Sequence, residues 1–257
     1  MNIVIITGAS SGIGREFALQ MDGHFNSIDE FWLVARSRER LSELAEALVH
    51  RSRIFPVDLT KKSGQEALEE AVKEQKAVVR VLVNCAGYGV MGAFDRQNRD
   101  LELGMIRLNC EALTDLTHRM IPHMRPGSRI IQMASSAAFL PQPDFAVYAA
   151  AKAYVLSFSR ALGEELRRSK IFVTSVCPGP VDTPFFEIAE ASGSTLAVKK
   201  YTMVTPERVV ALALRDSCKK RPMSVCSMPM KTFLLLSRLM PHGVIFQALR
   251  MLKGVEK

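Results

Sequence analysis

Tyr148 and Lys152 are the residues of this chain whose types and spacing most directly suggest proton-transfer chemistry. They stand four positions apart in an alanine-rich stretch, so a helix over residues 146–168 would place both side chains on one face, one turn apart. A free phenol has a pKa near ~10 and is a poor base at neutral pH, but a neighbouring ammonium group favours the phenolate. The pair therefore predicts a tyrosine tuned for acid–base work. A lone pair with this spacing is more often a surface contact on a helix, so its interpretation depends on the features that accompany it.

The start of the chain carries a glycine-rich turn that suits a phosphate group. An apolar run leads into Thr7, and glycines follow at positions 8, 12 and 14, where a helix pattern begins. Glycines let the backbone come close to a ligand, and a helix that opens at such a turn directs its N–H groups at that ligand. The spacing Thr-Gly-x-x-x-Gly-x-Gly differs from the commoner Gly-x-Gly-x-x-Gly fingerprint, and glycine-rich turns also occur for packing reasons alone. The residues expected at the phosphates are Gly8, Ser10, Ser11, Gly12, Ile13 and Gly14.

The end of the second predicted strand, residues 31–35, indicates which dinucleotide binds. An enzyme that uses NAD often has Asp or Glu there, which bonds the ribose 2′-hydroxyl. This chain has Ala35 and then Arg36, and an arginine can bind a 2′-phosphate through two hydrogen bonds. Arg36 therefore predicts NADP(H), with Arg38 or Ser37 as candidates to assist it. The alternative is that Arg36 is a solvated residue at a strand end.

Three more segments complete an ordered set of motifs. Ser135 precedes Tyr148, Asn84-Cys85-Ala86-Gly87 follows a predicted strand, and Pro178-Gly179 follows another. Together with the glycine turn and the Tyr-x-x-x-Lys pair, these segments resemble the short-chain dehydrogenase/reductase family in its NADP(H)-preferring type. The resemblance covers about residues 1–227.

The resemblance implies a catalytic set of four residues. Ser135 lies thirteen residues before Tyr148, the interval usual in the family, and would hydrogen-bond the substrate oxygen; Ser136 is the alternative. Tyr148 would exchange the proton, and Lys152 would tune it. Asn109 would hold a water that links Lys152 to solvent.

The resemblance also implies the remaining contacts to the cofactor. The residue after Asn84 departs from the family pattern, because Cys85 stands where a second asparagine is usual. This departure puts one structural hydrogen bond in question and leaves the chemistry unchanged. The expected contacts are Asp58 and Leu59 at the adenine, Asn84, Ala86 and Gly87 at the adenosine, and Tyr148, Lys152, Pro178, Gly179, Val181 and Thr183 at the nicotinamide end.

These features together predict an NADP(H)-dependent oxidoreductase that reduces a ketone or aldehyde to an alcohol, by hydride transfer with Tyr148 as the acid or base. Apolar residues in the segments expected to line the pocket favour an apolar or acyl substrate, although they could equally pack the flap itself. They are the aromatic Phe139, Phe145, Phe185 and Phe186 and the aliphatic Leu140. Two alternatives stay open: a non-catalytic NADP-binding redox sensor or regulator, and a membrane-associated reductase of lipid or steroid-type ketones.

The elements that must position these residues alternate along the chain. Near-continuous apolar runs, typical of buried parallel strands, alternate with helix patterns, which predicts a parallel sheet covered on both faces. A chain of 257 residues fits one domain. We therefore predict a single α/β domain, a Rossmann-like doubly wound parallel sheet of about seven strands. Strands are expected near residues 2–7, 31–35, 53–57, 79–84, 128–134, 171–177 and 223–227, and helices near 12–21, 38–49, 63–76, 99–124, 146–168 and 206–220. Residues 182–204 show weak periodicity and, by resemblance, form a flap over the substrate.

The C-terminal segment differs in charge from the rest of the chain. Residues 199–257 hold 12 Lys and Arg against 3 Asp and Glu, a net +9, whereas the whole chain carries +8. We divide the chain into an NADP-binding catalytic domain, residues 1–227, and a basic amphipathic extension, residues 228–257. Residues 232–252 are too interrupted for a transmembrane span and could form two short amphipathic helices on a membrane or on a neighbouring subunit. An ordinary solvated terminal helix is the alternative.

The cysteines, the histidines and the N-terminal sequence indicate the compartment of the protein and which ligands it lacks. The chain shows no secretion signal, its five cysteines form no C-x-x-C pair, and a cytoplasmic protein with reduced thiols is expected. No histidine or cysteine spacing suggests a metal site, and no nucleic-acid-binding motif accompanies the basic tail. The family resemblance implies a homodimer or homotetramer, paired through the helices at residues 99–124 and 146–168.

Overall fold

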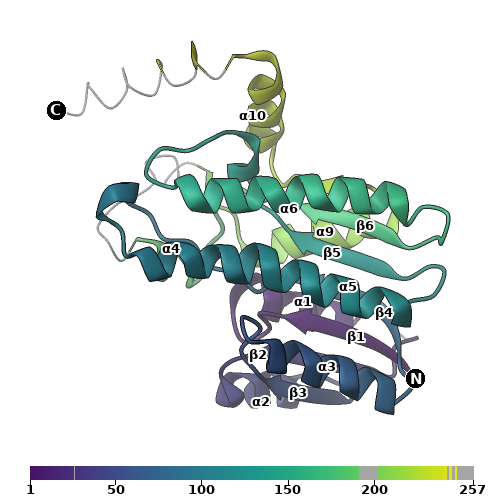
Figure 1. The fold of residues 1–257 in the computed structure, drawn as a ribbon. Helices are drawn as coiled ribbons and strands as arrows, with labels where there is room; N and C mark the ends of the chain where they lie inside the picture. The colour runs from purple at the N-terminus through teal and green to yellow at the C-terminus, as the bar shows by residue number, and fades with distance from the viewer. Residues whose placement is uncertain (26, 191–201, 242, 245–246, 248–257) are drawn as a thin grey trace.

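A seven-stranded parallel sheet runs through the computed structural model of the chain, in the order β3-β2-β1-β4-β5-β6-β7 (Figure 1). The structure describes residues 1–25, 27–190, 202–241, 243–244 and 247. The strands are β1 (Asn2–Thr7), β2 (Glu30–Ala35), β3 (Ser52–Pro56), β4 (Val78–Asn84), β5 (Arg129–Met133), β6 (Phe172–Val176) and β7 (Met223–Ser224). The predicted Rossmann-like sheet is confirmed. Its strand order reverses between β1 and β4, and in such sheets ligands bind at the carboxyl ends of the strands beside this point.

Helices cover both faces of the sheet because its strands are apolar on both. Val4 and Ile6 of β1 belong to one core cluster with α1, α2 and α9, whereas Ile3 and Ile5 belong to the opposite cluster with α3, α5 and α6. Figure 1 shows α3, α5 and α6 on the near side of the sheet. These helices are α1 (Gly12–Asp22), α2 (Arg38–Ala47), α3 (Lys62–Glu74), α5 (Leu113–Met120), α6 (Ala146–Glu165) and α9 (Pro206–Cys218).

The segment expected as one helix over residues 99–124 changes its hydrogen-bonding pattern midway. It consists of α4 (Arg99–Ile106), a π-helical turn (Arg107–Ala112), α5 and a short 3-10 turn (Ile121–His123). Asn109, a predicted site residue, lies inside the π-helical turn. Such turns occur often at functional sites, because they shift the side chains that follow relative to a regular helix.

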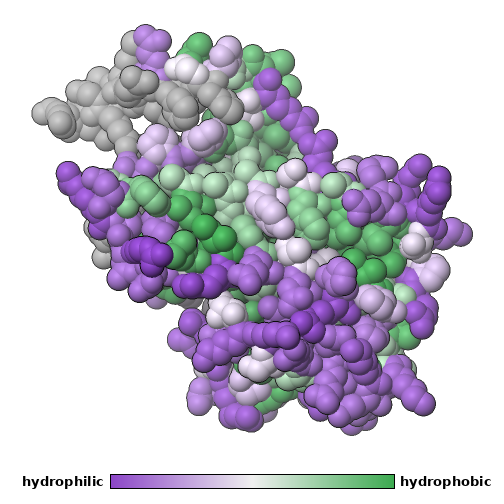
Figure 2. All heavy atoms as spheres, in the orientation of Figure 1, coloured by the Kyte–Doolittle hydropathy of each residue, from purple (hydrophilic) through white to green (hydrophobic). Residues whose placement is uncertain are grey.

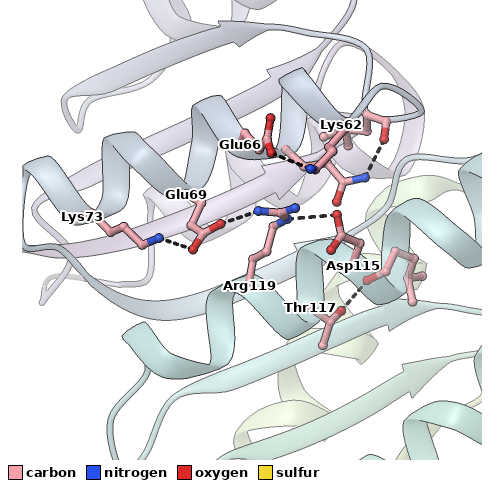
Figure 3. Close-up of polar contacts among 10 residues, drawn as sticks. Lys62, Glu66, Glu69, Lys73, Asp115, Thr117 and Arg119 are labelled. Carbon is pink, nitrogen blue, oxygen red and sulfur yellow. Dashed lines mark hydrogen bonds and ion pairs between the residues drawn. The ribbon is translucent and has the colours of Figure 1, made fainter.

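An ion-pair network joins α3 to α5 (Figure 3). The guanidinium of Arg119 donates to Asp115, one turn earlier, at 2.9 Å, and also to Glu69 of α3, which pairs with Lys73 as well. Hydrogen bonds from Lys73 and Arg119 lower the pKa of the Glu69 carboxyl. The network links the second half of α3 to α5.

The described part of the segment after β6 includes a short helix, α7 (Phe185–Ala189), in the region expected as a flap. The two ends of that region meet, because Val181 forms a β-bridge with Val204 and the Asp182 amide donates to the Val204 carbonyl at 2.9 Å. Residues 191–201 lie outside the described part of the chain.

The last strand is shorter than predicted. Strand β7 has two residues, where residues 223–227 were expected as a strand. Helix α10 (Met228–Leu239) overlaps the start of residues 232–252, where two short amphipathic helices were expected, and residues 242, 245–246 and 248–252 of that stretch lie outside the described part of the chain. Among the residues that are described, no helix has both the length and the hydropathy that crossing a membrane requires.

Candidate active site

The glycine turn between β1 and α1 leaves no room for side chains at three positions. Gly8 and Gly12 have positive φ angles of 69° and 51°, a backbone region that favours glycine. A Cβ on Gly8 would lie 2.9 Å from the backbone of Ala86, and one on Gly14 would lie 2.2 Å from the Gly8 carbonyl oxygen. Ser11, the N-cap of α1, makes no side-chain capping hydrogen bond, and α1 has no acidic residue in its first turn. This uncapped helix start behind a glycine cradle fits the pyrophosphate of a dinucleotide.

Hydrogen bonds of the Thr7 side chain connect the glycine turn to the turn after β4. Its hydroxyl accepts hydrogen bonds from the amides of Cys85, at 3.0 Å, and Ala86, at 3.1 Å, and donates to the Val83 carbonyl at 3.3 Å. The side chain of Thr7 is buried. The hydroxyl of Thr7 therefore holds together the two turns expected at the cofactor by binding backbone amides, which needs no asparagine at position 85.

Arg36 follows β2 at the carboxyl edge of the sheet and is exposed. Burial of Asp58 opposes its ionisation, but hydrogen bonds from Thr60 and the charges of Arg36 and Lys61 outweigh it and lower the pKa of this carboxyl. Arg36 thus lies close enough to Asp58 to interact with it. The hydroxyl of Ser37 accepts a hydrogen bond from the Arg40 amide and caps α2, so it is already engaged.

The residues expected at the adenosine lie at the ends of β3 and β4. A cavity of about 240 Å³ opens beside Leu59 and Thr60, between α3 and the segment of the π-helical turn and α5, and among the residues expected at the adenosine only Leu59 lines it. The amide nitrogen of Asn84 donates to Thr117 at 2.9 Å and to Gln132 at 3.0 Å, inside the protein. A contact of Asn84 with a dinucleotide would therefore use its backbone.

Tyr148 lies in the first turn of α6 and is only 7% exposed. Burial raises the pKa of its phenol to about 12, and a side-chain hydrogen bond with Ser135 acts in the opposite direction. Ser135 comes directly after Ala134 at the end of β5, and its hydroxyl also accepts from the Ala137 amide at 3.1 Å. The neighbouring Ser136 donates its backbone amide to the Pro178 carbonyl at 2.8 Å. Of the two serines, Ser135 is the one whose side chain interacts with Tyr148.

Lys152 stands one turn after Tyr148 on α6, as its spacing predicted. Its ammonium nitrogen lies 5.6 Å from the centre of the Tyr148 ring and donates to the Met133 carbonyl at 2.7 Å. Burial lowers the pKa of Lys152 to about 8, because water is excluded from the charged form. Three thiols, those of Cys85, Cys110 and Cys177, lie near enough to oppose this shift.

Asn109 is fully buried and pairs with the backbone of Tyr88. Its side-chain oxygen accepts from the Tyr88 amide at 3.2 Å, and its side-chain nitrogen donates to the Tyr88 carbonyl at 2.9 Å. A Cβ on Gly87 would lie 2.7 Å from the Asn109 oxygen and 3.5 Å from the Lys152 nitrogen, so these residues meet at Gly87. Because both ends of the Asn109 amide are engaged, its main-chain carbonyl is the better candidate to hold a water.

The segment after β6 lies against the glycine turn. A Cβ on Gly12 would lie 3.1 Å from the side chain of Thr183, whose hydroxyl donates to the Val181 carbonyl at 3.4 Å. Gly179 is covered from the other side by Met230 of α10, whose sulfur would lie 2.8 Å from a Cβ at that position. The residues predicted for the nicotinamide end therefore lie between the phosphate turn and the C-terminal helix.

Aromatic rings cover the phenol of Tyr148. Phe145 stacks on it with ring centres 4.2 Å apart, and Phe185 of α7 is tilted against it at 5.5 Å. Gly89 makes room for both rings, since a Cβ there would lie 2.8 Å from Phe145 and 2.9 Å from Phe185. In the described residues, His, Cys, Asp and Glu side chains form no group of three or more that could hold a metal ion.

Two roles in the site were not predicted from the sequence. Thr7 was named only as the first residue of the glycine motif, although a polar residue that ends an apolar strand there could have indicated the hydrogen bonds of its hydroxyl. Tyr88 gave no such signal, because its backbone, rather than its side chain, holds Asn109. The predicted residues Asn109, Ser135, Tyr148 and Lys152 are brought together by β5, α6, the π-helical turn and the turn at Gly87.

Comparison with known proteins gives the family. The model of the short chain dehydrogenase family matches residues 2–192. A fatty acyl-CoA reductase of Acinetobacter baylyi is 31% identical over 234 residues, which cover 88% of this chain and 75% of that protein. A short-chain dehydrogenase of Sphingobium yanoikuyae, solved in complex with NADPH, has a TM-score of 0.77 and 27% identity over 89% of each chain. A short-chain dehydrogenase/reductase of Burkholderia phymatum in complex with NAD has a TM-score of 0.80 at 20% identity, covering 91% of this chain and 92% of that one, and shows the similarity of fold alone. The chain belongs to the short-chain dehydrogenase/reductase family of oxidoreductases.

Proposed function

We propose that this protein reduces a carbonyl substrate to an alcohol with NADPH. The observation that carries the proposal is the arrangement of Ser135, Tyr148 and Lys152 at the carboxyl edge of the sheet, beside an uncapped helix start in a glycine cradle. NADPH, when bound, supplies the hydride for the carbonyl carbon.

The side chains supply the proton and the orientation. The Ser135 hydroxyl and the Tyr148 phenol bind the carbonyl oxygen, which fixes the substrate for reaction. Burial keeps the phenol protonated in the cofactor-free protein, so Tyr148 is ready to donate its proton to that oxygen. Lys152 then stabilises the phenolate, and a water on the Asn109 main-chain carbonyl returns a proton from solvent.

NADPH is preferred over NADH in this proposal because of Arg36. A guanidinium at the end of β2 can bind a 2′-phosphate, and the position before it is Ala35 rather than an acid. Asp58 is an acid that interacts with Arg36, and one oxygen of its carboxylate is engaged by the hydroxyl of Thr60 at 2.7 Å and by the Thr60 amide at 2.9 Å. Arg36 therefore keeps hydrogen-bonding capacity for a phosphate.

The substrate in this proposal is apolar next to its carbonyl group. A substrate that reaches Tyr148 must replace the contact that Phe185 makes with the phenol, and it then packs against Phe145 and the bare backbone of Gly89. Such walls favour acyl chains or rings over charged groups. The similarity to a fatty acyl-CoA reductase supports the same substrate class.

The subunits are proposed to pair through α4 and α6 in a homodimer or homotetramer, in a reducing cytoplasm. Leu101 and Ile106 of α4 and Tyr154 of α6 are all more than two-fifths exposed, and Thr114 is hydrogen-bonded to Tyr154 at 2.8 Å. Size-exclusion chromatography with light scattering measures the assembly directly. The five cysteines are all free, which is typical of a reducing compartment.

The test is NADPH and NADH oxidation by the purified full chain over a panel of short aldehydes, long-chain aldehydes, aromatic ketones and 3-oxoacyl thioesters. The proposal predicts turnover that prefers NADPH and is faster for the long-chain and aromatic compounds. Tight NADPH binding with no turnover on any compound would favour a non-catalytic NADP-binding regulator instead.

A further inference from the structure

Helix α10 packs on the catalytic domain with one of its faces. Met230 lies against Gly179, and Phe233 lies 6.1 Å, between ring centres, from Phe139. Leu234 packs in one apolar cluster with Met230 and Phe139. Residues 230, 233 and 234 have the three- and four-residue spacing of a helix face that packs on a core. Gly179 belongs to the turn proposed at the nicotinamide, and Phe139 closes the 3-10 turn that begins after Ser135. The inner face of α10 therefore borders the proposed active site.

The opposite face of α10 is also apolar, but it is exposed. Met228, Leu235 and Leu239 are spaced seven and four residues apart, so they share one stripe, and they are 71%, 58% and 70% exposed. Leu236, at the margin of this stripe, is 46% exposed. Figure 1 shows α10 standing away from the body of the fold, and Figure 2 shows hydrophobic residues at the surface of that projecting part. A contiguous exposed apolar stripe of this kind marks an interaction surface.

The charges around the apolar stripe indicate that its partner is negatively charged. Lys231 and Arg238, both exposed, flank it on one side of the helix. No Asp or Glu occurs anywhere between residues 217 and 255, whereas the same stretch holds seven Lys and Arg. A partner that covers the stripe must therefore offer an apolar layer beside negative charge, and an anionic phospholipid surface offers both.

We propose that the outer face of α10 seats the protein on the surface of an anionic phospholipid bilayer, with the edge of the active site facing the lipid. The apolar stripe enters the boundary between headgroups and acyl chains, while the two cations remain among the headgroups. This placement goes beyond the proposed reaction, and it gives an apolar substrate a short path from the bilayer to Tyr148. The competing occupant of the stripe is a second copy of this chain.

The experiment measures sedimentation of the full chain with extruded vesicles of phosphatidylcholine alone and of phosphatidylcholine with phosphatidylglycerol. It compares the wild type with Leu235→Glu/Leu239→Glu, with Lys231→Gln/Arg238→Gln, and with Val49→Glu as a matched control on an apolar residue that is 92% exposed elsewhere. Circular dichroism and NADPH binding establish that each variant is folded, and the molar mass of each is measured by light scattering.

We expect the wild type and Val49→Glu to bind the anionic vesicles and to bind the neutral ones much more weakly. Removing the two charges lowers binding roughly 10- to 30-fold, and the two glutamates abolish it. Equal vesicle binding by the wild type and the glutamate variant would overturn the proposal, as would no binding by the wild type. A lower molar mass in the glutamate variant, with no wild-type vesicle binding, would assign the stripe to a second copy. Vesicle binding needs no turnover, so its result is independent of the test of the reductase.

Discussion

Replacing Gly14 with alanine tests the cradle of the phosphate site. In an ordinary helix interior, Gly→Ala stabilises by up to about 1 kcal/mol. Here the added Cβ would lie 2.2 Å from the carbonyl oxygen of Gly8 and 2.7 Å from its carbonyl carbon. The two backbones would have to separate by about 1.2 Å to reach the 3.4 Å at which ordinary contact begins. Gly8 has little space to move away, because it packs so closely on Ala86 that a Cβ on Gly8 would lie 2.9 Å from the Ala86 backbone.

Overpacking of this kind costs about 1–3 kcal/mol, so we expect Gly14→Ala to lower the free energy of unfolding by about 1–2 kcal/mol after the gain in helix propensity. The first turn of α1 moves with it, and the loss of one N–H hydrogen bond to a charged phosphate costs about 1.5–3 kcal/mol of binding free energy. We therefore expect the affinity for NADPH to fall at least tenfold, as measured by calorimetry.

Gly23→Ala is the matched control at the other end of the same helix. Gly23 has φ −80°, and nothing lies within 4 Å of its added Cβ. This variant should gain about 0.4–1 kcal/mol in urea unfolding and should bind NADPH as the wild type does. If Gly14→Ala matches Gly23→Ala in both stability and NADPH affinity, the close packing of the glycine turn is refuted.

Three further predictions concern the hydrogen bonds of Thr7, the cofactor preference and the buried Lys152. Thr7→Val leaves the amides of Cys85 and Ala86 unpaired and should lower the free energy of unfolding by about 2–4 kcal/mol; a loss no larger than that of Thr7→Ser would contradict the role of the hydroxyl. Arg36→Ala should weaken NADPH binding roughly 10- to 100-fold with little effect on NADH, and an equal loss for both would remove Arg36 from the phosphate site. Burial gives Lys152 a folded-state pKa of about 8 against an ordinary 10.5, so between these pH values the unfolded chain holds a proton that the folded protein lacks. Lys152 alone would therefore make the unfolding free energy rise from pH 8 to 10.5, whereas the thiols of Cys85 and Cys177, whose pKa burial raises from 9.0 to about 12, make it fall above pH 9. In urea titrations of the cofactor-free protein, the stability of the wild type relative to Lys152→Met should increase from pH 8 to 10.5, and a difference that stays constant over this range would contradict the lowered pKa of Lys152.

The strands and the glycine cradle were predictable because their physics is local. An apolar run such as the one in β1 is stable only when buried, and the glycines after it stand where any Cβ would meet backbone. The helical phase of Tyr148 and Lys152 follows from their spacing alone. These features therefore follow directly from the order of the residues.

The break in the helix over residues 99–124 was not predictable, because its cause lies outside the helix. Residues 107–112 contain ordinary helix formers, and the π-helical turn accompanies the pairing of Asn109 with the backbone of Tyr88, which is 21 positions away. The aromatic cover of Tyr148 by Phe185 likewise joins distant segments. Contacts of this kind depend on how the finished sheet brings its loops together.

The most direct test of the central claim compares the wild type with Tyr148→Phe in two measurements on the same preparations. One is the rate of NADPH oxidation with the best substrate of the carbonyl panel, and the other is the dissociation constant for NADPH. We expect the variant to bind NADPH within about threefold of the wild type and to lose at least about 100-fold in kcat, because only the proton donor has been removed. Turnover that survives in Tyr148→Phe would show that another group supplies the proton and would contradict the assignment on which the proposed mechanism depends.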